Sequence, residues 1–164
     1  GSGGMVVELA KLCPDSIFSL VELPSIAEIA QQRVKKSDVG ARINIIEADL
    51  TKDWSQERLF DGIVLRSVIQ VLGLEQSKVA LENLIKGLSP KGEVFVIGRV
   101  LENNRLAPAE AVSANVMFLN VYDSGGSFTV NEYEQLFKGV GLALKDKVSL
   151  SGGYTILQFS HTKT

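Results

Sequence analysis

Three features of this sequence have residue types and a spacing suited to holding a nucleoside. The chain opens with Gly1-Ser2-Gly3-Gly4, and a glycine-rich turn lets backbone amides approach a ligand closely. Glu22 follows about 20 residues later, where a carboxylate, which only accepts hydrogen bonds, suits both hydroxyls of a ribose. Asp49 can accept from an adenine amino group, with Leu50 beside it as an apolar wall. The spacing predicts a cofactor site at the ends of successive strands.

Each feature also has an ordinary explanation. Gly-Ser-Gly-Gly before Met5 is what a cloning linker leaves. Glu22 is of a type common at solvated strand ends, and Asp49 suits a helix cap or a loop. Three such features at three successive strand ends favour the cofactor interpretation.

Hydrophobic periodicity predicts the elements that position these residues. Apolar runs of strand length alternate with amphipathic stretches, as in a parallel sheet covered by helices on both faces. The sequence predicts strands at 17–21, 43–46, 62–65 and 94–97, and helices at 5–12, from Pro24, at 75–88, at 109–120 and from Thr129 to Gly141.

Local signals mark where some of these elements begin. Ser25 and Glu28 have the spacing of a capping box, as do Thr129 and Glu132. Ser89-Pro90-Lys91-Gly92 predicts a turn before the strand at 94–97.

The last two apolar runs, 142–150 and 154–159, are joined only by Ser151-Gly152-Gly153. So short a connection forces an antiparallel pair, because a parallel crossover needs a dozen or more residues. We therefore expect an α/β fold: a doubly wound, mostly parallel, Rossmann-like sheet with a C-terminal antiparallel hairpin. Among open α/β sheets this ending is typical of methyltransferases rather than of dinucleotide-binding dehydrogenases.

Composition narrows the classes of partner. The 164 residues are 45% apolar with a formal net charge of -2, so we expect one globular domain (1–164) without nucleic acid as a partner. No apolar run approaches the roughly 20 residues of a membrane span, and no leader is evident, so we expect a cytoplasmic protein. Cys13 is the only cysteine and His161 the only histidine. We expect Cys13 to be a buried structural thiol and expect no metal site.

The chain resembles the catalytic domain of the plant and bacterial small-molecule O-methyltransferase family, which includes caffeate, hydroxyindole and polyketide O-methyltransferases. The resemblance covers almost the whole chain and rests on residues 1–14, 20–30, 47–50, 61–69, 88–94, 125–133 and 140–142. It implies a class I methyltransferase that uses S-adenosylmethionine, releases S-adenosylhomocysteine and methylates a small-molecule acceptor.

Carried over by position, the resemblance implies roles for individual residues. Gly1 and Gly3 would face the methionine part of the cofactor, Glu22 and Leu23 the ribose, and Asp49 and Leu50 the adenine. Arg66 stands where the family has lysine; it would steady the cofactor carboxylate or be an ordinary surface residue. Met117, Phe118 and Tyr122 would belong to the acceptor pocket or to the core.

The sequence departs from the family pattern at two positions that bear on the mechanism. The family has a histidine base where this chain has Gln70, and a supporting glutamate where it has Gly98. An amide cannot act as a base at neutral pH. Transfer would then rely on proximity, on an acceptor that is ionised or otherwise nucleophilic, and on Gln70 to orient it. Alternatively, Gln70 is a loop residue in a protein that binds the cofactor without transfer.

The family fold also has a first strand before the glycine loop and an upstream helical domain that forms a dimer. We find no residues for either, so we expect an N-terminally truncated domain from a protein that forms a homodimer. A noncatalytic cofactor-binding domain and, less favoured, a nicotinamide-dependent oxidoreductase are the alternatives to a methyltransferase.

Overall fold

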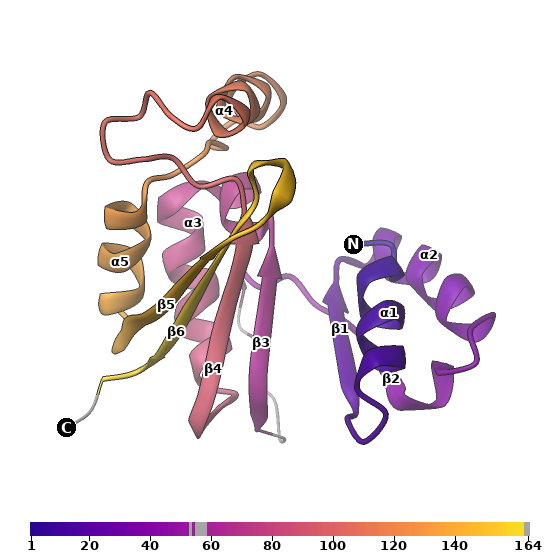
Figure 1. Ribbon diagram of the computed structural model, residues 1–164. Helices are drawn as coiled ribbons and strands as arrows, with labels where there is room; N and C mark the ends of the chain where they lie inside the picture. Colours follow the sequence, from indigo (N-terminus) through magenta and orange to yellow (C-terminus); the bar gives the residue numbers. More distant parts are fainter. Residues whose placement is uncertain (53, 55–58, 163–164) are drawn as a thin grey trace. The chain divides into compact units, whose positions relative to one another are not determined.

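A computed structural model describes residues 1–52, 54 and 59–162 (Figure 1). The chain forms two compact units, Gly1–Asp49 and Leu50–Thr164. Each is described by itself below, and the assignment of 1–164 as one domain stays a prediction. Among the described residues, no helix has both the length and the apolar character needed to cross a membrane.

The first unit is a two-stranded parallel sheet with two helices. Its elements are α1 (Gly4–Leu12), β1 (Phe18–Glu22), α2 (Pro24–Lys35), the 3-10 turn η1 (Gly40–Arg42) and β2 (Ile43–Glu47). Phe18 pairs with Ile43 and Glu22 with Glu47, so both strands end at the same edge. The core joins residues from both helices and both strands: Val6, Val7, Ala10, Val34 and Ile43, with Phe18, Leu20, Val39 and Ile45 packed against it.

The end of α1 is held by an arginine. The Arg42 guanidinium donates to the carbonyl of Ala10 in the last turn of α1 and to those of Cys13 and Ser16 in the connection that follows. The expectation that Cys13 is buried is wrong, because its side chain is exposed. The core-facing side of α1 is already filled by Val6, Val7 and Ala10, and the connection after the helix runs along the surface.

The predicted capping box at Ser25 and Glu28 is also wrong. Leu23 is the N-cap of α2 and makes no side-chain capping bond, while Pro24 occupies the first helical position. Proline suits that position because its fixed φ is helical and its missing N–H would lack a partner there. The helix therefore begins before Ser25 can cap it.

The second unit contains a four-stranded sheet. Its strands are β3 (Phe60–Arg66), β4 (Leu88–Gly98), β5 (Leu142–Ser149) and β6 (Thr155–His161), in the order β3-β4-β6-β5. β3 and β4 are parallel, whereas β6 is antiparallel to both of its neighbours. The 3-10 turn η2 (Ser151–Gly153) joins β5 to β6. The predicted α/β fold class and the antiparallel C-terminal hairpin are confirmed.

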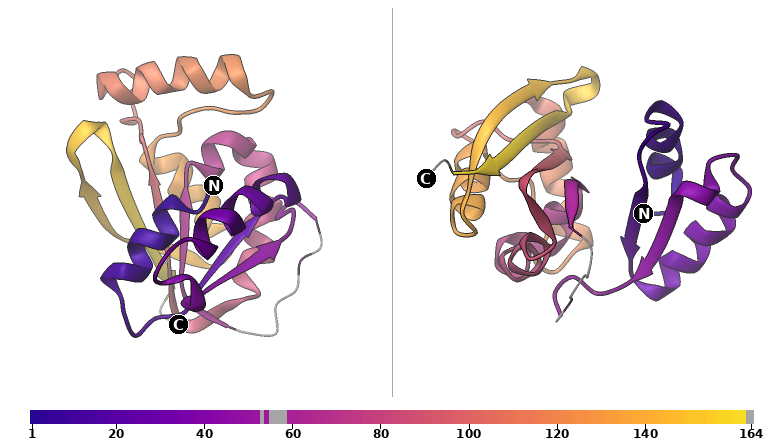
Figure 2. Two further views of the ribbon diagram at one scale, coloured as in Figure 1. Left: turned by 90° about the vertical axis from the view of Figure 1, so that its right-hand side faces the viewer. Right: turned by 90° about the horizontal axis from the view of Figure 1, so that it is seen from below.

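Three helices complete the second unit: α3 (Val68–Ile85), α4 (Ala109–Val121) and α5 (Val130–Lys138). Alternate residues of β4 and β6, such as Val94, Val96 and Leu157, are buried. Phe137 of α5 stacks on Phe159 of β6, with ring centroids 3.8 Å apart. α4 lies across the end of the unit where β4 finishes (Figures 1 and 2).

The boundaries of α3 differ from the prediction of a helix at 75–88. The helix begins earlier, at Val68. The non-helical backbone of Gly73 (φ 74°, ψ 173°) separates this first turn from the rest of the helix, where the predicted periodicity lies. At the other end the helix stops at Ile85, and β4 already includes Leu88 and the predicted turn 89–92. A register shift between the Phe60–Leu88 and Gly62–Glu93 pairs accommodates these residues in the strand.

Candidate active site

In the first unit, the glycine turn opens α1. Gly3 is the N-cap, with φ 85°, a left-handed conformation that favours glycine. Its amide donates to the carbonyl of Gly1 at 2.8 Å. A Cβ on Gly3 would lie 3.4 Å from the carbonyl oxygen of Ala30, so α2 packs closely against this turn. The first amides of α1 have no intrahelical partner and can serve a polar ligand.

Glu22 lies beside this turn at the carboxyl end of β1. The amino group of Gly1 forms an ion pair with the Glu22 carboxylate, whose side chain is 23% exposed. The amide of Ala48 donates to the carbonyl of Glu22 at 3.0 Å, which joins the two strand ends. Leu23 follows, 48% exposed, as the N-cap of α2. The first unit thus brings Gly1, Gly3, Glu22 and Leu23 to one edge of its sheet.

The remaining predicted cofactor residues lie after the next strands. Asp49 follows β2 at the same edge and is half-buried. Leu50 begins the second unit in a turn and is also half-buried. Arg66 is exposed at the end of β3. Their grouping with Glu22 around one cofactor stays a prediction.

In the second unit, Gln70 occupies the first turn of α3. It is a helical residue, 1% exposed, rather than the loop residue considered as an alternative. Neither Nε2 nor Oε1 has a hydrogen-bond partner among the described residues. Leaving a buried polar group unpaired costs about 1–3 kcal/mol, so such a group needs an explanation. A buried amide with one donor and one acceptor face unoccupied is suited to hold a polar ligand.

Two glycines make room for Gln70. A Cβ on Gly98, the last residue of β4, would lie 2.0 Å from Gln70 Nε2. A Cβ on Gly125 would lie 2.9 Å from the Gln70 carbonyl oxygen, and the Gly126 amide donates to that oxygen at 2.9 Å. The missing side chain of Gly98 is therefore what allows the Gln70 amide to lie there.

The residues predicted for the acceptor pocket lie on and after α4. Phe118 is buried and stacks on Tyr122, with ring centroids 5.8 Å apart. A Cβ on Gly125 would lie 2.8 Å from Tyr122 Cβ and 3.2 Å from the Phe118 carbonyl oxygen. The structure thus brings Gln70, Phe118 and Tyr122 together around Gly125. Met117, on the same helix, is 49% exposed.

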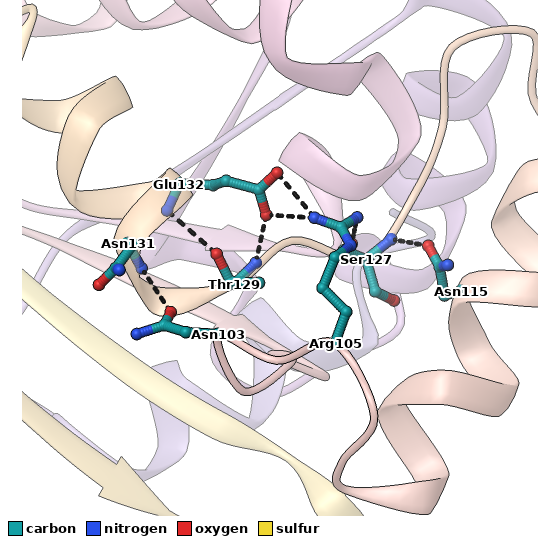
Figure 3. Close-up of polar contacts among 7 residues, drawn as sticks. All are labelled: Asn103, Arg105, Asn115, Ser127, Thr129, Asn131 and Glu132. Carbon is teal, nitrogen blue, oxygen red and sulfur yellow. Dashed lines mark hydrogen bonds and ion pairs between the residues drawn. The ribbon is translucent and has the colours of Figure 1, made fainter.

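A polar network holds α4 to the segments that flank it (Figure 3). Both carboxylate oxygens of Glu132 accept from Arg105 Nη1 at 2.8 Å, and Oε2 also accepts from the Thr129 amide. Because the Glu132 amide donates to Thr129 Oγ1, the predicted capping box of α5 is confirmed. Asn115 on α4 accepts from the Ser127 amide at 2.8 Å.

The same contacts change the acidity of Glu132. Burial opposes ionisation of its carboxyl, but the hydrogen bonds from Thr129 and Arg105 outweigh that penalty and hold the pKa below its ordinary value. At the next residue, burial raises the pKa of the Tyr133 hydroxyl well above its usual range. Glu132 is thus a charged anchor, while Tyr133 is a neutral core residue.

Sequence reasoning missed the residues that position Gln70 and α4. Gly73, Gly125 and Asn115 were not predicted as part of the site. Gly73 offered one signal, since an isolated glycine inside an apolar helical stretch often has a packing role. Nothing local distinguishes Gly125 or Asn115, because their partners lie in other elements.

The comparisons with known proteins agree with this architecture. The family model described as the O-methyltransferase domain matches residues 1–143, most of the chain. The chain belongs to this O-methyltransferase family. Acetylserotonin O-methyltransferase of Gallus gallus is 25% identical over 141 residues, which are 86% of this chain and 40% of that protein. Aclacinomycin 10-hydroxylase RdmB of Streptomyces purpurascens is 26% identical over 172 residues, covering 98% of this chain and 44% of that protein.

Solved structures also share the fold of this chain. LaPhzM has a TM-score of 0.89 at 19% identity, over 99% of this chain and 48% of that chain. CalO1, a methyltransferase in calicheamicin biosynthesis solved in its S-adenosylhomocysteine-bound form, has a TM-score of 0.86 at 23% identity, over 99% and 46%. At these identities the likeness establishes the fold alone. The chain spans less than half the length of the O-methyltransferase relatives it matches.

Proposed function

We propose that the protein to which this chain contributes transfers a methyl group from S-adenosylmethionine to a hydroxyl or other nucleophile of a small molecule, without a protein base at position 70. Membership of the O-methyltransferase family supports the reaction class. The observation that carries the rest is the buried amide of Gln70, which lies beside Gly98 at the end of β4 and has no hydrogen-bond partner among the described residues.

The residues of the first unit fit the proposed cofactor. Gly3 has no side chain to obstruct the turn, and the first amides of α1 have no intrahelical partner, so they can receive a carboxylate. The Glu22 carboxylate lies at the carboxyl end of β1 and is partly exposed, so it can accept from a hydrogen-bond donor such as a ribose hydroxyl. In the same proposal Leu23 packs on the ribose, Asp49 and Leu50 on the adenine, and Arg66 near the cofactor carboxylate.

Bound S-adenosylmethionine would supply an electrophilic methyl group on a sulfonium. The chain's own contribution is orientation: Gln70 Nε2 donates to an acceptor oxygen, or Oε1 accepts from its hydroxyl. Phe118 and Tyr122 would close the apolar side of the acceptor pocket, with Met117 at its exposed rim. Holding the two reactants in line can contribute several kcal/mol to the rate, about 7–11 at most. An acceptor that arrives ionised needs no proton removed.

The cofactor assignment is tested by titrating S-adenosylhomocysteine into the full-length protein and its Glu22→Ala variant. We expect the variant to bind at least tenfold more weakly, because two hydrogen bonds to the ribose are lost. Glu8→Ala is the matched control, since Glu8 is an exposed glutamate that pairs only with Lys11 on α1. Equal binding by wild type and Glu22→Ala, or no binding by the wild type, would refute the assignment.

The base-free mechanism is tested by the pH dependence of methyl transfer. With a histidine base, kcat/KM would fall below about pH 6.5, the ordinary pKa of histidine. Here we expect kcat/KM to follow the pKa of whichever acceptor hydroxyl is used, and to shift when acceptors of different acidity are compared. A fall in kcat/KM below about pH 6.5 that is the same for all acceptors would contradict the mechanism.

A second candidate is a cofactor-dependent protein that does not transfer the methyl group. The absence of a base at Gln70 favours it, and one relative is named as a hydroxylase rather than a methyltransferase. Binding of S-adenosylmethionine without methyl transfer to a broad panel of phenols, carboxylic acids and amines would select this candidate. The family match and the antiparallel β6 disfavour a nicotinamide-dependent oxidoreductase. Homodimer formation by the full-length protein stays a prediction from the family resemblance.

A further inference from the structure

Asn83 is a buried polar residue on α3, 5% exposed, with every polar atom of its side chain occupied. Its Nδ2 donates to the carbonyl of Leu50 at 3.0 Å and to the carbonyl of Lys52 at 2.6 Å. Its Oδ1 accepts from Lys86 Nζ at 3.0 Å, one helical turn further along. One side chain thus holds two peptide groups of the turn that follows β2.

That turn contains Leu50, which the proposed function assigns to the adenine ring. The turn lies outside the helices and strands. Because a peptide group is planar, a hydrogen bond to its carbonyl fixes the orientation of the whole group. The peptide group that follows Leu50 in turn sets the direction of the chain after Leu50. Asn83, a helical residue 33 positions further along the chain, thus contributes to the conformation at Leu50.

We propose that Asn83 is a positioning residue for the adenine end of the cofactor site. It would not touch the cofactor, but would fix the backbone that presents Leu50 to the adenine ring. α3 would then contribute to both proposed binding sites, with Gln70 in its first turn at the methyl acceptor and Asn83 near its last turn at the adenine end of the cofactor. This inference rests on the proposed function, since it presupposes that S-adenosylmethionine binds at Leu50.

Asn83→Asp is the sharpest perturbation, because it keeps the shape of the side chain and removes both donors. The new carboxylate would face two carbonyl oxygens and repel them, so the turn must rearrange. Asn120→Asp is the matched control: Asn120 is exposed on α4, and its Nδ2 likewise donates to a carbonyl, that of Val116, at 2.6 Å.

The readout is the preference of the full-length protein for S-adenosylhomocysteine over S-inosylhomocysteine, which differ only at position 6 of the purine. Titration calorimetry gives both Kd values. For Asn83→Asp we expect Kd for S-adenosylhomocysteine to rise roughly tenfold, the equivalent of one lost hydrogen bond. We expect Kd for the inosine analogue to change less, so that the preference narrows, because the residue before Leu50 is Asp49, the proposed acceptor for the adenine amino group that the inosine analogue lacks. Partial unfolding would weaken both ligands by the same factor and leave the preference unchanged.

The outcomes separate this inference from the function beneath it. If the wild type does not bind S-adenosylhomocysteine, the proposed function fails. If the wild type binds and prefers adenine, but Asn83→Asp keeps that preference, the positioning role of Asn83 is refuted. Should Asn83→Asp not fold, Asn83→Ala replaces it, because alanine removes both donors without placing a charge against the two carbonyls. A narrowed preference then supports the inference and an unchanged one overturns it.

Discussion

Gly98→Ala should destabilise the second unit through one contact. The added Cβ would lie 2.0 Å from Gln70 Nε2 and 3.1 Å from Gln70 Cδ, inside van der Waals contact distance. Because Gln70 is 1% exposed, its amide cannot move aside into solvent. Overpacking of this kind costs about 1–3 kcal/mol of unfolding free energy.

The double-mutant cycle isolates that contact. Gln70→Ala removes two unpartnered polar atoms and leaves a cavity, opposing effects that should nearly cancel. In the Gln70→Ala background there is space for the new methyl group, so Gly98→Ala should then change the unfolding free energy by less than about 0.5 kcal/mol. The expected coupling between positions 70 and 98 is therefore about 1–3 kcal/mol.

Urea unfolding followed by tryptophan fluorescence measures these values. Trp54 is the only tryptophan of the sequence, and it is buried and stacked on Phe60 in the second unit, so it reports that unit. Gly62→Ala is the control, since the nearest atom to its Cβ would be 3.9 Å away on Phe95. If Gly98→Ala costs the same with glutamine or alanine at position 70, the steric argument is wrong.

Two further predictions concern structural anchors. Arg42→Met should destabilise the first unit by about 1–3 kcal/mol, because the carbonyls of Ala10, Cys13 and Ser16, in and after the last turn of α1, lose the guanidinium donor. Hydrogen exchange of the α1 amides measures this effect. Arg33→Met, which removes one hydrogen bond to the Ser2 hydroxyl at 3.3 Å, should have a smaller effect. Glu132→Gln should destabilise the second unit at pH 7 but not in acid. The pKa of Glu132 is depressed in the folded state, so its ionised carboxylate stabilises the fold above its unfolded pKa. That stabilisation is lost as the pH falls through the folded pKa, below about pH 4. A difference in urea midpoint between wild type and Glu132→Gln that stays constant from pH 7 to pH 3 would contradict that assignment.

Much of the fold was predictable because its signals are local. Apolar runs located the strands, since a strand buried in a parallel sheet needs an almost continuous apolar segment. The three-residue connection Ser151-Gly152-Gly153 required an antiparallel hairpin on length alone, and β5 and β6 form one. Thr129 and Glu132 predicted the start of α5 because both partners of a capping box lie within one helical turn.

Local signals also failed where a neighbour in sequence or a contact in space overrode them. Pro24 begins α2 before Ser25 can cap it, and Gly73 breaks the periodicity that would have revealed the turn containing Gln70. Cys13 is exposed because the core-facing positions of α1 are already occupied.

The candidate site, like the fold, was predictable only where its signals are local in the sequence. The sequence alone predicted which residues to consider: Gly3 and Glu22 for a cofactor, and Gln70 where the family resemblance implies a base. Only the tertiary structure decided that Gln70 is buried with no hydrogen-bond partner among the described residues, that Gly98 provides its space and that Asn83 holds Leu50. These contacts join residues about 30 positions apart, and their geometry follows from how α3 packs against β4 and the turn after β2. Periodicity and propensity describe one element at a time and carry no information about such distances.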